Sequence, residues 1–281
     1  KLCQDQECML LLPRLLENPA TKERAIGLVS RLSAASPAAL EMCIDISGMD
    51  VLASLFDSAD VGVQARAADV FARYAAQASR RPGLLEAGCV PAALKMLDST
   101  ATVEPQHRQQ REAALLGVVR GLASLCEDSA AQDDVARSGA LAAVLKLLDT
   151  PSSEMRVAVV SVLSRLSTST EALEQLGNPA TVAALARALA QAGKSPAAPA
   201  LLRLLTELVR RDKDGEAKVA EAVERECLAT LLSQQLFNAD STADVMDLLL
   251  ELLVRRPREC GAVLLDQQHA KAFNLLFAFV E

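Results

Sequence analysis

The sequence predicts an all-α fold in which about six similar helical repeats stack into an elongated solenoid. Hydrophobic residues make up 51% of the 281 residues but aromatic residues only 2%. Alanine and leucine favour helices, whereas strands favour the aromatic and β-branched residues that are scarce or secondary here. A short phrase recurs along the chain, and the longer segments carry apolar residues at helical spacing.

The recurring phrase is a small residue, often glycine, followed by a short apolar helix and a polar turn. Its glycine anchors are Gly48, Gly88, Gly139 and Gly177, and extension to Glu226 and Gln268 gives steps of 40, 51, 38, 49 and 42 residues. The average falls in the range of ~40 to 47 residues typical of repeats built from two or three helices. The clearest copies are Ser47 to Ser58, Ala87 to Ser99 and Ser138 to Thr150; fainter ones begin at Gln6, Leu176, Arg225 and Asp266.

A longer helix is expected to close each repeat. Val157, Val160, Leu163 and Leu166 recur every three residues, which predicts one buried helical face. The polar stretch Thr100 to Gln110 contains a proline and explains the longest step as an inserted surface loop. Equivalent long helices are expected at residues 65–76, 111–125, 200–209 and 245–254.

A glycine before a short "aLvkLL" helix, a turn of Asp, Ser and Thr, and an Ala-rich helix ending like "VLSRLS" resemble the armadillo repeat family. The resemblance covers essentially the whole chain. It implies a right-handed superhelix whose third helices line a concave groove. We expect residues 1–281 to form one armadillo-repeat domain, and we expect it to be part of a longer chain because the apolar segment Phe273 to Glu281 does not resemble a polar cap.

The resemblance also implies where a partner binds. In this family an Asn near the end of the third helix holds an extended peptide. Here charged residues occupy that position, except in one repeat, where Gly121 occupies it with Arg120 beside it. Arginine suits carboxylates and phosphates, so we expect an acidic segment in the first half of the groove and a basic continuation in the second. The positions are Arg31, Arg73, Arg120, Arg165, Glu207 and Glu251.

Two alternatives to this groove hypothesis stay open. The charges can pair with Asp or Glu of an adjoining repeat, or they can simply be solvated on an exposed face. The absence of tryptophan and of the Asn series argues against a reader of basic nuclear-localisation signals.

Composition excludes several other kinds of partner. The net charge of -7 and the pI of about 5.1 argue against a nucleic-acid binder, which needs a basic face. No apolar run reaches the ~20 residues that a membrane-spanning helix requires. The seven cysteines lack paired short spacings, so we expect a reducing compartment, the cytoplasm or else the nucleus.

Motifs that carry chemistry are missing, so we expect neither an enzyme nor a bound metal or cofactor. The two histidines, His107 and His269, lie in no recognisable catalytic setting. There is no Cys-x-x-Cys, no His-x-x-x-His and no glycine-rich phosphate loop. Asp212 to Gly215 begins like a calcium loop, but the later acidic residues are misplaced for one, which predicts a turn.

The sequence therefore predicts a non-catalytic scaffold that binds a protein or peptide segment. A co-chaperone is the alternative, because residues 45–77 resemble the armadillo units of the exchange factors that embrace a heat-shock chaperone. Myosin chaperones of the UCS type are a further alternative on the same fold.

Overall fold

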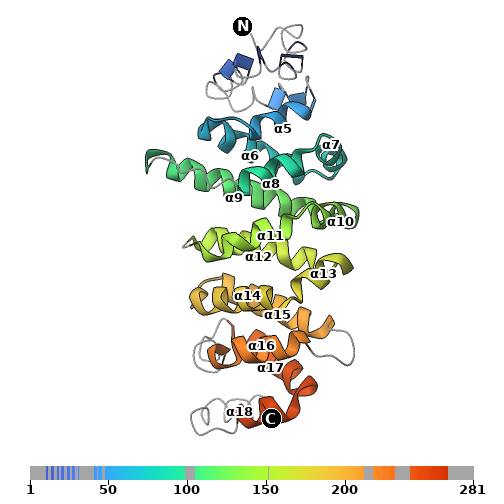
Figure 1. The fold of residues 1–281 in the computed structure, drawn as a ribbon, viewed down its shortest axis with the longest axis vertical. Coiled ribbons are helices and arrows are strands. Elements are labelled where there is room, and N and C mark those ends of the chain that lie inside the picture. The colour runs from blue at the N-terminus through green and yellow to red at the C-terminus, as the bar shows by residue number, and fades with distance from the viewer. Residues whose placement is uncertain are drawn as a thin grey trace. The chain divides into compact units, whose positions relative to one another are not determined.

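The structure is a computed structural model, and the residues that it describes form helices and turns with no strand among them (Figure 1). The chain divides into two compact units, Lys1–Val144 and Leu145–Glu281, and each is described here by itself. The division does not test the expected single domain, which stays a prediction. The described residues are 11, 14–15, 18, 20–21, 24–25, 27–28, 31, 41–42, 44–45, 48–98, 105–150, 152–211, 218–231 and 241–264.

In the first unit, helices of the same kind pack on one another. Short α5 packs on α8 and long α6 packs on α9, while α10 packs on α7 and α9. This pairing of like with like is the stacking of a solenoid. The bounds are α5 (Asp50–Phe56), α6 (Val61–Ala75), η2 (Ala78–Arg80), α7 (Arg81–Glu86), α8 (Cys89–Asp98), η3 (Pro105–His107), α9 (Arg108–Leu125), α10 (Ser129–Arg137) and α11 (Ala140–Leu145).

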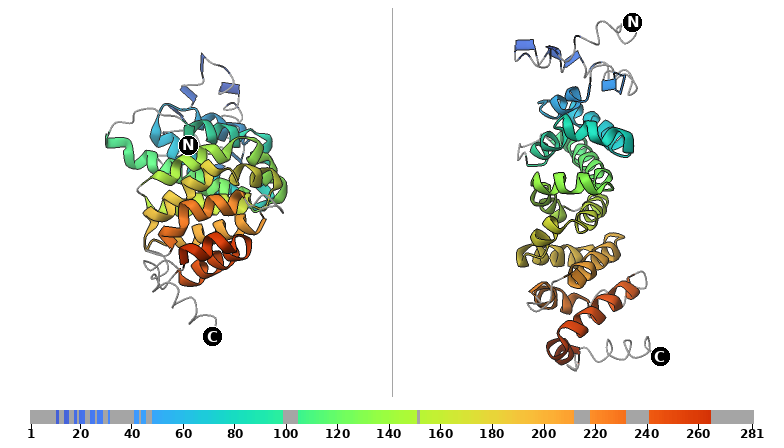
Figure 2. Two further views of the ribbon diagram at one scale, coloured as in Figure 1. Left: turned by 60° about the horizontal axis from the view of Figure 1, so that its bottom comes forward. Right: turned by 90° about the vertical axis from the view of Figure 1, so that its right-hand side faces the viewer.

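The second unit repeats the pattern with its own helices. The long helices α12, α15 and α17 pack in succession, and α14 packs on α16 beside them (Figure 2). The bounds are η4 (Lys146–Asp149), α12 (Ser153–Leu166), α13 (Thr170–Leu176), α14 (Pro179–Ala192), α15 (Ala197–Arg211), α16 (Lys218–Thr230), α17 (Thr242–Arg255) and α18 (Pro257–Leu264).

The recurring glycines have a structural cause. Gly48, Gly88 and Gly139 have φ values of 93°, 67° and 81°, a region that disfavours side chains. Each lies at the corner before the second helix of its repeat, at the start of α5, α8 or α11. The glycine phrase in the sequence therefore marks a backbone corner in three consecutive repeats.

The long helices α6 and α9 approach closely because α9 carries two glycines on the packed face. A Cβ at Gly121 would lie 2.3 Å from Cδ1 of Phe71, and a Cβ at Gly117 would lie 2.9 Å from that of Ala68. Phe71 is fully buried and packs edge-to-face on Phe56 of α5, with ring centroids 5.7 Å apart. The small residues on α9 thus make room for one of the few rings in the chain.

All five predicted third helices are confirmed as α6, α9, α12, α15 and α17. One expectation was wrong in part: the insertion before α9 is helical from Pro105 onwards, because this polar stretch continues into the helix instead of ending as a loop. Several predictions fall outside the described residues: the turn at Asp212 to Gly215, His269, the phrase beginning at Asp266, and the segment Phe273 to Glu281.

Candidate partner-binding surface

The exposed side of the third helices in the second unit carries ion pairs between neighbouring repeats. Arg203 of α15 donates from Nε to Asp244 of α17 at 2.8 Å, and Arg210 of α15 donates to Glu251 of α17 at 2.7 Å. The hydrogen bond with the carboxylate raises the pKa of each arginine. Both pairs span 41 residues, so they join equivalent faces of successive repeats.

Two further arginines reach across the same helices to backbone oxygens. Arg211 donates to the carbonyl of Ser167, the C-cap of α12, at 3.1 Å. Arg255 donates to the carbonyl of Arg210 at 2.8 Å. These carbonyls belong to helix ends that lack intrahelical partners, so the guanidinium groups also cap the helices. The surface is therefore held in place by side chains from the repeat that follows.

In each of the two ion pairs the arginine is the more exposed partner. The Arg203 side chain is 74% exposed and Asp244 is 12% exposed; the corresponding values for Arg210 and Glu251 are 51% and 26%. A guanidinium has five N–H donors, so one ion pair leaves others directed at solvent. The most exposed charged groups of α15 are consequently cationic hydrogen-bond donors, beside the half-buried carboxylate of Glu207.

The first unit has a comparable cluster at the end of α6. Arg73 pairs with Glu41 and, at 3.1 Å, with Asp69 of its own helix. Beside it the Tyr74 hydroxyl donates to Asp45 at 2.8 Å, and Arg80 pairs with the same carboxylate while lying 4.1 Å from the tyrosine ring centroid. The hydrogen bond from Arg80 lowers the pKa of Asp45, and burial raises the pKa of Tyr74.

The structure places the predicted groove residues as follows. Arg31 and Arg120 are exposed and Arg165 is half-buried. Arg73, Glu207 and Glu251 each form an ion pair within the chain, Glu207 with Arg211 of its own helix. The alternative in which such charges pair internally therefore holds for these three, and for Glu251 the partner lies on the neighbouring repeat. Whether the set binds a partner stays a prediction.

The predicted register of α9 needs a correction. The buried residues Ala67, Phe71 and Tyr74 of α6 correspond to Val118, Leu122 and Leu125 of α9, each 51 residues further along. The same shift of 51 residues makes Ser124 the equivalent of Arg73, so Arg120 lies one helical turn before the groove position. Gly121, expected at the groove position with Arg120 beside it, instead faces Phe71 in the packed interface, where its lack of a side chain is needed.

Arg203 and Arg210, which carry outward positive charge on α15, were not among the predicted groove residues. A signal for them was available: both arginines precede an acid by 41 residues, close to the repeat length, at Asp244 and Glu251. Opposite charges one repeat apart on the exposed face of stacked helices predict an ion pair between neighbours.

Three further features of the described part of the chain concern metal binding, the cysteine thiols and membrane-spanning helices. No group of three or more His, Cys, Asp or Glu residues there is arranged to hold a metal ion. Burial raises the pKa of the Cys89 and Cys227 thiols to about 12, so both thiols are protonated at neutral pH. No helix among these residues is both long and apolar enough to cross a membrane.

Comparisons with known proteins agree with this architecture. The sequence matches no protein-family model, and no curated protein matches it. Among solved structures, computationally designed armadillo repeat proteins for modular peptide recognition give a TM-score of 0.64 at 18% identity, over 89% of this chain and 99% of that chain.

Two further solved structures show the same likeness. A designed armadillo repeat protein in complex with the peptide (KR)4 gives a TM-score of 0.61 at 18% identity, over 87% of this chain and 99% of that one. An engineered protein gives 0.62 at 20% identity, over 88% of this chain and 96% of that one. At these identities the likeness concerns architecture, and the chain has the fold of an armadillo-repeat-like α-solenoid.

Proposed function

We propose that this chain is a non-catalytic scaffold that binds an extended acidic segment of a partner protein along the exposed face of its third helices. The observation that carries the proposal is the exposure of Arg203 and Arg210, whose acidic partners are the more covered members of each pair. An incoming carboxylate can accept hydrogen bonds from the guanidinium groups without displacing the existing ones.

The fold supports the same proposal. In the designed relative the bound peptide is (KR)4, which is basic. The present chain has arginines as the outward groups of α15, so its preferred peptide has the opposite charge. This differs from the basic continuation expected in the C-terminal half of the groove. That expectation rested on Glu207 and Glu251, and both carboxylates form ion pairs with arginines of the chain.

The test is a comparison of two peptides of mirrored charge. Fluorescence polarisation with labelled (DE)4 and (KR)4 measures binding to the full chain at several salt concentrations. We expect (DE)4 to bind, with affinity that falls as salt rises, and (KR)4 to bind less well. Absence of (DE)4 binding, or equal binding of both peptides, contradicts the proposal.

Matched variants locate the site. The double variant Arg203→Met and Arg210→Met removes both outward cations and is expected to weaken (DE)4 binding by roughly 3–10-fold. Arg187→Met removes another exposed arginine, from the second helix α14, and is expected to have no effect. Equal weakening by the control would mean that general charge, and not the third-helix face, determines binding.

A complementary variant tests the direction of the effect. Asp244→Asn with Glu251→Gln releases both arginines from their carboxylates, so (DE)4 should bind more tightly than to the wild type. Circular dichroism of every variant confirms that the helices remain. Faster nucleotide release from a heat-shock chaperone in the presence of the chain would instead favour the co-chaperone alternative.

A further inference from the structure

Arg156, in the second turn of α12, is a largely buried arginine with no ion pair among the described residues. Only 8% of its surface is exposed. Its Nε is buried and has no hydrogen-bond partner within the described part of the chain. A buried N–H without a partner is unfavourable, so this position offers an unused donor to an anion.

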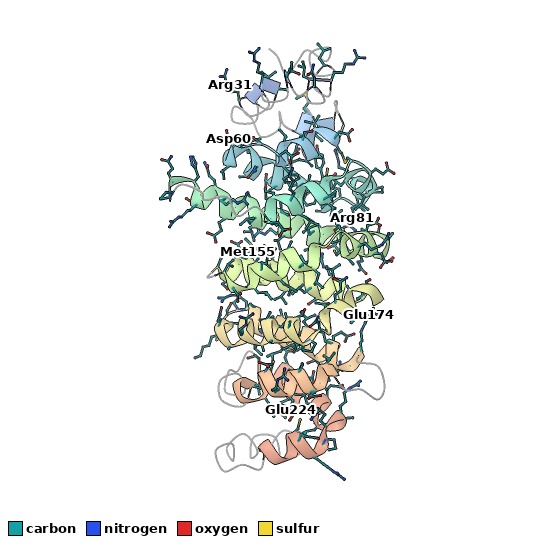
Figure 3. All side chains as sticks on the ribbon, in the orientation of Figure 1. Arg31, Asp60, Arg81, Met155, Glu174 and Glu224 are labelled. Carbon is teal, nitrogen blue, oxygen red and sulfur yellow. The ribbon has the colours of Figure 1, made fainter. Side chains whose placement is uncertain are left out.

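Arg81 shows what the chain does with a buried arginine when it serves the fold. It is also 8% exposed, and Figure 3 labels it near α7. Its Nε donates to the carbonyl of Ala75 at 2.8 Å, and its terminal nitrogen pairs with Glu127. The same residue type at the same burial thus has a bonded Nε in one repeat and an unbonded Nε in another, which sets Arg156 apart from Arg81.

We expect the Arg156 side chain to lie over the start of α12. Side chains in helices lean toward the N-terminus and lie over the preceding turn, which for Arg156 contains Ser152 and Ser153. Gln64, which like Arg156 is four residues after the N-cap of its helix, donates back to the carbonyls of Phe56 and Ser58. Ser152 is the N-cap, and its hydroxyl accepts from the N–H of Met155, which Figure 3 labels, at 3.4 Å. In this direction the guanidinium is expected close to the positive end of a helix of 14 residues.

More polar groups gather at this end of the helix. The hydroxyl of Thr150, two residues before the N-cap, is buried and also lacks a hydrogen-bond partner among the described residues. The Ser153 hydroxyl lies 2.6 Å from that of Ser195, in the turn before α15, and Lys194 beside it is exposed. The acidic group nearest in sequence, Glu154, is exposed and two positions from Arg156, so the two side chains project from different sides of α12.

We infer that the N-terminal end of α12, with the guanidinium of Arg156, binds a phosphate-type oxyanion. The first N–H groups of a helix point outward and, with the helix dipole, favour a phosphate. The guanidinium adds a planar fork that matches phosphate oxygens, and the Thr150 hydroxyl can donate to a third oxygen. The site does not depend on the peptide-binding face proposed above, because its ligands come from the start of α12.

Thermal unfolding of the full chain in rising inorganic phosphate, at constant ionic strength, tests this site. A ligand that binds only the folded state raises Tm in a saturable way. We expect this rise for the wild type and for Arg187→Met, which removes an exposed arginine from α14, and no rise for Arg156→Met. A wild type that does not respond to phosphate, or an Arg156→Met variant that still responds, overturns the inference.

The phosphate-free samples separate a binding role from a structural one. Methionine has a similar length and no charge, so Arg156→Met should unfold at the same temperature as the wild type or above it. A clear fall in Tm without phosphate would mean that the arginine is satisfied in the fold and would overturn the inference. A third comparison identifies the source of the phosphate: a phosphoserine peptide and inorganic phosphate are titrated against the same samples. Tighter binding of the peptide indicates a phosphorylated partner, and tighter binding of inorganic phosphate indicates a free ion.

Discussion

Replacing Gly121 by alanine is expected to destabilise the first unit, because α6 and α9 leave no room for a methyl group at that point. The new Cβ would lie 2.3 Å from Cδ1 and 2.4 Å from Cε1 of Phe71, and that ring is fully buried. Overpacking of this kind costs about 1–3 kcal/mol, while the change from glycine to alanine in a helix gains about 1 kcal/mol. Contacts this short place the cost in the upper part of that range, at about 2–3 kcal/mol, so we expect Gly121→Ala to lower the free energy of unfolding by about 1–2 kcal/mol.

Urea unfolding followed by circular dichroism measures the effect. Stacked repeats can unfold in more than one step, so the midpoints and the slopes of all transitions are compared. Gly27→Ala is the control, because nothing lies within 4 Å of a Cβ at that helical glycine. It should leave the stability unchanged or raise it by up to about 1 kcal/mol.

A double variant identifies the contact itself. Phe71→Leu shortens the side chain that faces Gly121, so Phe71→Leu with Gly121→Ala should cost less than the sum of the two single changes. If Gly121→Ala is as stable as the wild type while Gly27→Ala behaves as predicted, the close approach of α6 and α9 is wrong, and with it the packing assigned to the first unit.

Two further predictions concern buried polar groups. Arg81→Met should lower the free energy of unfolding by about 1–3 kcal/mol in urea, because Ala75 O and Glu127 lose their partner; an unchanged midpoint would refute the role given to these bonds. The Cys89 and Cys227 thiols should resist alkylation in the folded chain and react after unfolding, as mass spectrometry can show, and rapid modification of the folded chain would contradict their burial. The pKa of both thiols in the folded chain is about 12, above the ordinary value of 9.0. Their contribution to stability is therefore complete below pH 9.0 and is lost as the pH rises towards about 12. The urea midpoint should fall over that interval.

The repeat architecture could be predicted because each of its determinants is local in sequence. The glycines at 48, 88 and 139 mark corners that need a positive φ, and the apolar period of the third helices marks the face that is buried. Both signals recur in successive repeats, so an error at one repeat is corrected by the others. The start of α9 was misjudged because a polar, proline-containing stretch can begin a helix as well as interrupt one.

The binding surface was harder to predict because it depends on relations between repeats. A shift of a few residues in one inserted segment placed Arg120 where the buried pattern places Ser124. The sequence also does not show which member of an ion pair is covered, and this decides that Arg203 rather than Asp244 faces solvent. Arg156 was not singled out at all, since its lack of a partner is visible only once neighbouring helices are packed.

Hydrogen-exchange mass spectrometry with and without the (DE)4 peptide tests the central claim most directly, because it reports where a bound segment lies. If the third-helix face binds acidic segments, exchange should slow in residues 197–211 and 242–255, which form α15 and α17, and remain unchanged in α14 and α16. Protection confined to α14 and α16, or no protection at a peptide concentration that saturates polarisation, would contradict the account.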